Sequence, residues 1–202
     1  MLVVVGGHSR NLGKTSLVAG LIRKFRGRNW TAVKITQYGH HVCDNHDTHC
    51  GCEAEPGAPF ALTEEYEPGN TDSARFLAAG AGRALWLRTP AGQLPLAAGT
   101  IQKILHQNEN VIMESNSVVE LVRPDLFLMM LDFGCADFKP SSLRFMDRAD
   151  AFVVLDRGIN IPLWNDLACG RWDLQPRFPV KPPRYLSPAV ADFVSSRLSP
   201  PA

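Results

Sequence analysis

The sequence predicts an α/β protein with three layers, in which a mostly parallel β-sheet lies between two layers of helices. Apolar runs of strand length alternate with segments of helical periodicity as far as about residue 156. Several of these runs are almost continuous in apolar residues, as in residues 3–5, which is typical of strands buried on both faces. In such sheets ligands bind at the carboxyl ends of the strands. The polar motifs of this chain follow the ends of expected strands, so we expect one shared site there.

Each expected element follows from a local pattern. Leu17, Leu21 and Phe25 recur at helical spacing after the first strand, which predicts a helix over residues 16–25 that ends in a left-handed cap at Gly27. Thr71 is an expected N-cap for a short helix over residues 71–79. The other expected elements are strands over residues 30–36, 84–88, 111–114, 126–131 and 151–155 and a helix over residues 96–107.

The turn after the first strand has the pattern of a phosphate-binding loop (P-loop). Gly13, Lys14 and Thr15 stand where the turn enters the helix, although His8 occupies the position of the usual first glycine. In a P-loop the backbone N–H groups point at phosphate, the lysine reaches the β- and γ-phosphates, and the threonine hydroxyl binds Mg²⁺. The alternative is a strand–turn–helix corner with an incidental Gly-Lys-Thr. The residues expected to bind a nucleoside triphosphate are Gly7, His8, Ser9, Arg10, Asn11, Leu12, Gly13, Lys14, Thr15 and Ser16.

Two carboxylates are the candidates for metal binding and catalysis beside Lys14. Glu114 ends an apolar strand, where a carboxylate can bind Mg²⁺ or orient an attacking group, and Asp72 lies in the first turn of a helix. We expect Lys14, Glu114 and Asp72 to be catalytic, and Thr15, Glu114 and Asp72 to hold Mg²⁺. The structural alternatives are an ordinary acid at a strand end and an acid that complements a helix dipole.

Outside the P-loop, few residues point to a nucleotide contact or to a choice of base. Lys139 follows the strand expected over residues 126–131 and is assigned to the nucleotide, with simple solvent exposure as the alternative. The guanine-reading pattern Asn-Lys-x-Asp is absent, and only Asp156 and Asn160 stand near its place. Both GTP and ATP therefore remain open as ligands.

A cysteine- and histidine-rich segment follows the second expected strand. Three of the five cysteines and four of the six histidines of the chain fall within residues 40–52. Thiolates and imidazoles at this density suit tetrahedral Zn²⁺, although the spacing is not that of a standard zinc finger. The alternative is a loop with free, reactive thiols. The zinc ligands that we expect are Cys43, Cys50, Cys52 and His49.

Composition excludes several other classes of protein. The chain has 202 residues, 45% of them hydrophobic, and a formal net charge of +1, which argues against a nucleic-acid or membrane-surface binder. The N-terminus enters the first strand without the pattern of a signal peptide, and no apolar run approaches the ~20 residues that span a bilayer. We therefore expect a cytoplasmic protein with no membrane partner.

Four collinear motifs within residues 1–156 resemble the MobB-type P-loop proteins of molybdopterin-guanine dinucleotide biosynthesis. This resemblance implies an NTPase fold of the SIMIBI class, a homodimer, GTP binding with slow hydrolysis, and an accessory role in molybdenum cofactor maturation. The substitution at His8, the Cys/His-rich segment and the missing guanine motif depart from the family pattern. The motifs are Gly13-Lys14-Thr15, Val33-Lys34-Ile35-Thr36, Thr71-Asp72-Ser73-Ala74-Arg75 with Ala79-Gly80-Ala81, and Val111-Ile112-Met113-Glu114-Ser115.

Two functional classes fit this pattern best, and a protein that holds nucleotide without turnover is a third possibility. The first is an accessory NTPase that transfers the phosphoryl group to water, with molybdopterin or another small molecule as a partner. The second is an ATP-dependent kinase or ligase of the dethiobiotin synthetase type, in which Glu114, Asp72 and Lys34 surround a metabolite. We divide the chain into a nucleotide-binding domain over residues 1–156, with an insertion loop over 38–70, and a proline-rich extension over 157–202. The extension is expected to pack on this domain or on a partner.

Overall fold

The computed structural model describes residues 1–39, 58–168 and 171–198. In this part of the chain eight strands form a single sheet in the order β3-β4-β2-β5-β1-β6-β7-β8. All neighbouring pairs are parallel except β3 and β4, which confirms the predicted α/β class with a mostly parallel sheet. The strands are β1 (Leu2–Gly7), β2 (Thr31–Tyr38), β3 (Ala61–Glu65), β4 (Arg83–Pro90), β5 (Val111–Glu114), β6 (Leu126–Asp132), β7 (Ala151–Leu155) and β8 (Arg177–Val180).

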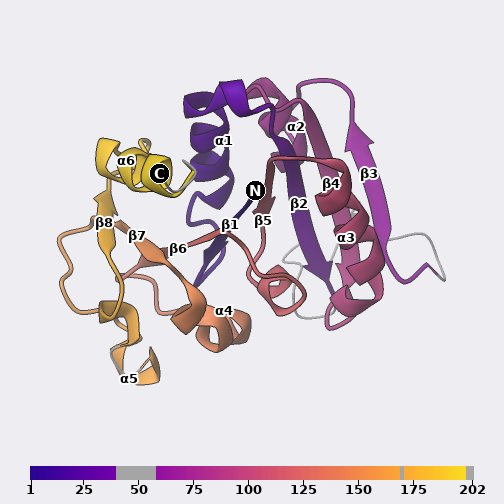
Figure 1. Cartoon of the computed structure of the whole chain (residues 1–202). Helices are drawn as coiled ribbons and strands as arrows, with labels where there is room; N and C mark the ends of the chain where they lie inside the picture. The colour runs from indigo at the N-terminus through magenta and orange to yellow at the C-terminus, as the bar shows by residue number, and fades with distance from the viewer. Residues whose placement is uncertain (40–57, 169–170, 199–202) are drawn as a thin grey trace.

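Helices cover both faces of the sheet (Figure 1). One apolar core joins the sheet to α1, α2 and α6, and the other joins the opposite face to α3, α4 and α5. Alternate side chains of each central strand enter opposite cores, as with Val3 and Val4 of β1. The helices are α1 (Lys14–Lys24), α2 (Asp72–Ala78), α3 (Ala98–Gln107), α4 (Pro140–Phe145), α5 (Asn165–Ala168) and α6 (Pro188–Leu198), and short 3₁₀ turns span Arg26–Arg28, Leu94–Ala97, Ser117–Glu120, Met146–Arg148 and Arg171–Asp173.

The structure adds two strands that the sequence pattern did not predict. β3 lies inside the expected insertion loop, and β8 lies inside the proline-rich extension. Both are edge strands with polar residues or a proline, such as Pro179 in β8, and so they lack the apolar run by which the central strands were predicted. The predicted cap at Gly27 was wrong, because the left-handed residue after α1 is Asn29, with φ of 49°.

Parallel pairing brings the carboxyl ends of the central strands to one edge of the sheet. Val5 of β1 pairs with Glu114 of β5, and Lys34 of β2 pairs with the same glutamate from the other side. The strand register therefore places Lys34 and Glu114 next to the turn that follows β1. Among the described helices, none combines the length and the apolar character needed to cross a membrane.

Candidate functional site

The turn between β1 and α1 has the geometry of an anion-binding helix start. Gly13 is the N-cap of α1 with φ of 86°, and the first intrahelical bond runs from Leu17 N–H to the Gly13 carbonyl. Within the described residues no side chain caps this helix, and its first turn has no acidic residue. The backbone N–H groups of that turn are therefore available to an anion, and the helix dipole favours negative charge there.

Lys14 folds back over this loop. Its Nζ donates a hydrogen bond to the Ser9 carbonyl at 2.8 Å. Burial lowers the pKa of Lys14 from its ordinary 10.5 to about 8, and the positive charge of Lys139 acts in the same direction. An ammonium with a depressed pKa in a partly buried position lacks a full counter-charge, and a phosphate group would supply one.

Side chains and backbone from two other segments fix the shape of the loop. Asn116 accepts a hydrogen bond from Gly7 N–H at 2.7 Å and donates one to the Gly7 carbonyl at 2.9 Å. Ser9 donates its hydroxyl to Asp137, and Lys139 N–H donates to the His8 carbonyl at 2.8 Å. The loop is therefore held at three positions. The Asn116 amide is thus engaged by Gly7.

The side chain of His8 packs beneath the loop. It is fully buried, and its ring centroid lies 5.1 Å from those of Phe138 and Trp164. Its Nδ1 accepts a hydrogen bond from Asp132 N–H at 3.3 Å, and its Nε2 lies 3.3 Å from the Cys135 carbonyl. Burial lowers the pKa of His8, and this pair of partners suits the neutral ring with its proton on Nε2. His8 therefore contributes to the loop through its backbone and through aromatic packing.

A cluster of charges lies beside the first turn of α1. Lys34 Nζ lies 2.6 Å from Glu114 Oε1 and 2.7 Å from Asp72 Oδ2, while the Thr15 hydroxyl donates to Glu114 Oε2 at 2.8 Å. Burial works to lower the pKa of Lys34, but the charges of Glu114 and Asp72 outweigh it and raise this pKa. Burial likewise works to raise the pKa of Asp72, and Lys34 outweighs it, so that this pKa is lowered. The structure thus brings Lys14, Thr15, Asp72 and Glu114 together as the sequence placed them.

The oxygen donors of this cluster suit Mg²⁺. The ion prefers hard oxygen ligands and keeps several waters, so one or two carboxylates, a hydroxyl and phosphate oxygens are enough to hold it. Glu114, Asp72 and Thr15 provide such donors around a point at which a cationic group, the Lys34 ammonium, already lies. In the described ranges no group of three or more Asp, Glu, His or Cys residues could form an all-protein metal site. A magnesium ion here would therefore depend on the nucleotide for part of its coordination.

Further cations surround the loop. Arg75 Nη2 donates to the Ser16 hydroxyl at 3.1 Å, and its Nη1 lies 3.6 Å from Asp72 Oδ1. Burial lowers the pKa of Lys139, and the nearby charge of Arg10 lowers it further. Because the pKa values of both Lys14 and Lys139 are lowered by burial and by neighbouring cations, this part of the loop favours an anion with several charges.

Two residues near the site were not identified from the sequence. Asp132, at the end of β6, is buried and accepts a hydrogen bond from Arg157 Nε at 2.7 Å. Tyr185 lies against Gly13 from the C-terminal segment. Asp132 could have been found from the sequence, because it directly follows a continuous apolar run of strand length. For Tyr185 the only sequence signal is an aromatic ring in a proline-rich region. Asp156, the weak candidate for base reading, is exposed and pairs with Lys181 at 3.3 Å.

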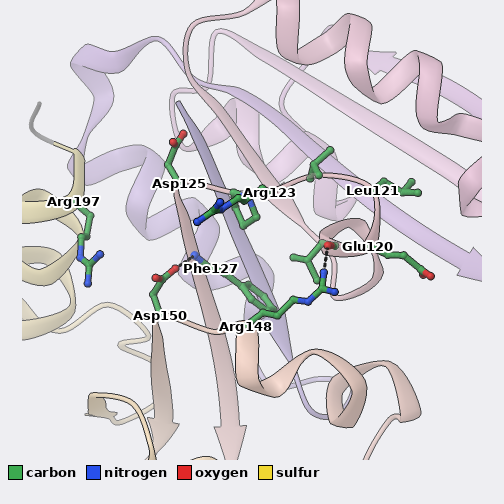
Figure 2. A pocket seen from close by; sticks show the side chains of 11 residues that line it. Glu120, Leu121, Arg123, Asp125, Phe127, Arg148, Asp150 and Arg197 are labelled. Carbon is green, nitrogen blue, oxygen red and sulfur yellow. Dashed lines mark hydrogen bonds between the residues drawn. The ribbon is translucent and has the colours of Figure 1, made fainter.

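A cavity of about 860 Å³ lies at the opposite end of the sheet, far from the P-loop. It is lined by the segment before β6, the start of β7 and the end of α6, and Figure 2 shows Arg123, Arg148 and Arg197 around it. The carboxylates at this end serve the backbone, since Asp125 accepts from Leu2 N–H at 2.6 Å and Asp150 from Phe127 N–H at 2.7 Å. The geometry of the loop and the uncompensated charge of Lys14 therefore make the carboxyl end the candidate functional site, even though this cavity is elsewhere.

The expected zinc ligands Cys43, His49, Cys50 and Cys52 lie outside the described residues, so zinc binding remains a prediction.

Comparisons with known proteins give only distant likenesses. No protein-family model matches the chain, and no curated protein shows significant similarity to it. One similar solved structure is LpxK from Aquifex aeolicus in complex with ATP, with 15% identity, a TM-score of 0.48 and coverage of 88% of this chain and 53% of that chain. Another is HypB from Helicobacter pylori in complex with nickel, with 13% identity, a TM-score of 0.49 and coverage of 97% and 84%. The present chain thus spans about half the length of the LpxK chain.

Proposed function

We propose that this chain is a Mg²⁺-dependent nucleoside triphosphate-binding protein that slowly hydrolyses GTP or ATP. One observation carries the proposal: the uncapped start of α1, the Lys14 ammonium and the Thr15–Glu114 pair lie together at the carboxyl edge of the sheet. Phosphoryl transfer requires little more of a protein than positioning and charge stabilisation, which these groups are placed to supply.

Each residue has a distinct role in this proposal. The N–H groups of the first turn of α1 bind the β-phosphate, and Lys14 exchanges the Ser9 carbonyl for β- and γ-phosphate oxygens. Thr15, Glu114 and Asp72 hold Mg²⁺, which when bound neutralises charge that develops on the phosphate oxygens. Gly7 to Ser16 form the phosphate cradle, and Lys139 lies at its rim.

We propose an accessory role in the maturation of the molybdenum cofactor or of another metal cofactor. The support is the set of collinear motifs that resembles the MobB-type proteins, because their charged members Lys14, Lys34, Asp72 and Glu114 gather at one site. A molybdopterin partner and a homodimer belong to the same proposal.

An ATP-dependent small-molecule kinase or ligase is the second candidate. The observation that favours it is Lys34, a second buried cation that contacts the same carboxylate as the P-loop threonine. A cation in that position suits an anionic acceptor beside the γ-phosphate. A rise in nucleotide turnover on addition of a metabolite favours this candidate, whereas a rise caused by molybdopterin or a metal-bearing partner favours the accessory role.

The experiment that tests nucleotide binding is calorimetric titration of ATP and GTP analogues with Mg²⁺. We expect Lys14→Ala to weaken binding at least tenfold, because hydrogen bonds to charged groups contribute about 1.5–3 kcal/mol each. Lys24→Ala, at the exposed far end of the same helix, is the matched control and should bind as the wild type does. Equal affinity of the wild type and Lys14→Ala, with intact circular dichroism spectra, would contradict the P-loop assignment.

A further inference from the structure

The segment that follows β8 crosses α1 at two glycines. We call residues 181–187 the strap. An ideal Cβ built on Gly13 would overlap the ring carbons of Tyr185, and one built on Gly20 would lie 3.2 Å from Leu186 Cβ. Gly13 and Gly20 are seven residues apart, which places them two turns apart on one side of the helix. The close approach of the strap therefore explains Gly20, and at Gly13 it adds to the positive φ of 86° that already favours glycine.

Gly20 in particular has no other structural reason to be a glycine. It lies inside α1 and has no positive φ, and a glycine in a helix interior costs about 1 kcal/mol relative to alanine. Contact with Leu186 offsets this cost because the strap can then pack directly on the helix backbone. The match between small residues on α1 and large residues on the strap indicates a docked interface.

Both ends of the strap are anchored. Its start directly follows β8, which pairs with β7, and Lys181 pairs with Asp156 at 3.3 Å. At its end Ser187 caps α6, which packs into the same core as α1 (Figure 1). The Tyr185 ring is thus held against Gly13 from both sides, at the point where the P-loop becomes the helix.

Gly13 is the residue through which this contact reaches the phosphate cradle. Its φ of 86° turns the loop into α1, and its carbonyl accepts the first intrahelical hydrogen bond. A ring packed on its Cα restricts the backbone that aims the first-turn N–H groups. We infer that Tyr185 is a positioning residue of the phosphate-binding loop, and that packing of its ring on Gly13 and binding of the nucleotide strengthen each other. This inference rests on the proposed nucleotide-binding function.

The contact is made by ring carbons, so the ring and not the hydroxyl carries the effect. Tyr185→Ala should weaken binding of the preferred Mg²⁺–nucleotide analogue about tenfold, because the loop must then be ordered at the expense of binding free energy. Tyr185→Phe keeps the ring and should restore the lost affinity. Leu186→Ala is the matched control, since it removes a contact of the same strap with Gly20, two turns away from the phosphate cradle, and leaves the Tyr185 ring at Gly13.

A second readout follows the strap itself. Trypsin can cleave after Arg184, which is exposed. In the wild type, nucleotide should slow cleavage at this bond, and in Tyr185→Ala the nucleotide should no longer protect it. A general loss of stability would not produce this specific loss of protection by ligand.

The outcomes separate the two proposals. A wild type that binds neither nucleotide overturns the proposed function and this inference with it. Wild-type binding that Tyr185→Ala leaves unchanged, or that Tyr185→Ala and Leu186→Ala weaken equally, overturns the inference alone. Weakening confined to Tyr185→Ala, with rescue by Tyr185→Phe, supports it.

Discussion

The two ends of the sheet use the same kinds of side chain in different ways. At the amino end Asp125 and Asp150 accept hydrogen bonds from strand N–H groups, so their charges help to hold the backbone. At the carboxyl end Glu114 and Asp72 face the Lys34 ammonium, and a loop of backbone N–H groups lies beside them. The difference teaches that a charged residue indicates function when its partners are other side chains that a ligand can replace. Cavity volume alone would have selected the amino end instead.

Replacement of Lys34 is the substitution expected to have the largest effect on the charge cluster at the carboxyl end. Lys34→Met leaves the buried Glu114 and the half-buried Asp72 without their shared cation, which should lower the free energy of unfolding by roughly 3 kcal/mol. Mg²⁺ should recover more stability in this variant than in the wild type, because the ion no longer competes with an ammonium group. Chemical denaturation with and without Mg²⁺ measures both effects.

The matched variant at the amino end is Arg148→Met. Arg148 is exposed, donates to the Val119 carbonyl at 2.7 Å and lies over the Phe145 ring. Its loss should cost about 0.5–1 kcal/mol, with no response to Mg²⁺. Equal stabilisation by Mg²⁺ of the wild type and Lys34→Met would show that Lys34 does not occupy the cation position.

Two acid-to-amide substitutions, one at each end of the sheet, test the same difference by removing a charge with little change in shape. Glu114→Gln keeps an oxygen that can accept from Thr15 but removes the carboxylate, and turnover should fall about 100-fold as metal binding weakens. Asp150→Asn keeps an acceptor for Phe127 N–H, and turnover should stay within about twofold of the wild type because this end only supports the backbone. Steady-state phosphate release measures both variants. Similar losses of turnover in the two variants would mean that Glu114 acts structurally, as Asp150 does.

Features formed by neighbouring residues could be predicted from the sequence, whereas features formed by contacts between distant segments could not. The P-loop is contiguous, and the fold class follows from strands such as residues 111–114, whose apolar runs are visible without any partner. The salt bridges of Lys34 depend on strand register, which the sequence alone does not specify. Strands β3 and β8 were missed because edge strands are half polar.

Tyr185 was the least predictable part of the site. Its contact with Gly13 joins the two halves of the chain and has no local pattern. The one hint in the sequence was Gly20, because a glycine inside a predicted helix lowers helix stability and can mark a close packing contact. The contact itself, with Leu186 of the strap, is seen only in the structure. Local motifs thus predicted the charged residues that gather at the candidate site, while the contact of Tyr185 with the loop could be found only from the tertiary structure.

The smallest predicted effect is a dependence of nucleotide affinity on pH. In the ligand-free protein burial and the charge of Lys139 lower the pKa of Lys14 to about 8, and a bound triphosphate would raise it by stabilising the ammonium. Binding then takes up a proton above pH 8, so affinity should be level below that pH and fall by up to about tenfold per pH unit above it.

The stability of the ligand-free protein should change with pH in the opposite direction. Because the folded-state pKa of Lys14 lies below the unfolded value of 10.5, the neutral form favours folding, and Lys14 contributes a gain in stability as pH rises from about 8 towards 10.5. Titrations at pH 7, 8 and 9 on the wild type and on Lys14→Ala measure the change in nucleotide affinity. Denaturation of both proteins at the same pH values measures the change in the free energy of unfolding. A wild-type affinity that is level through pH 9 would show that the triphosphate does not bind at Lys14. In that case Lys14 could no longer support the assignment of ligand binding to the carboxyl end of the sheet.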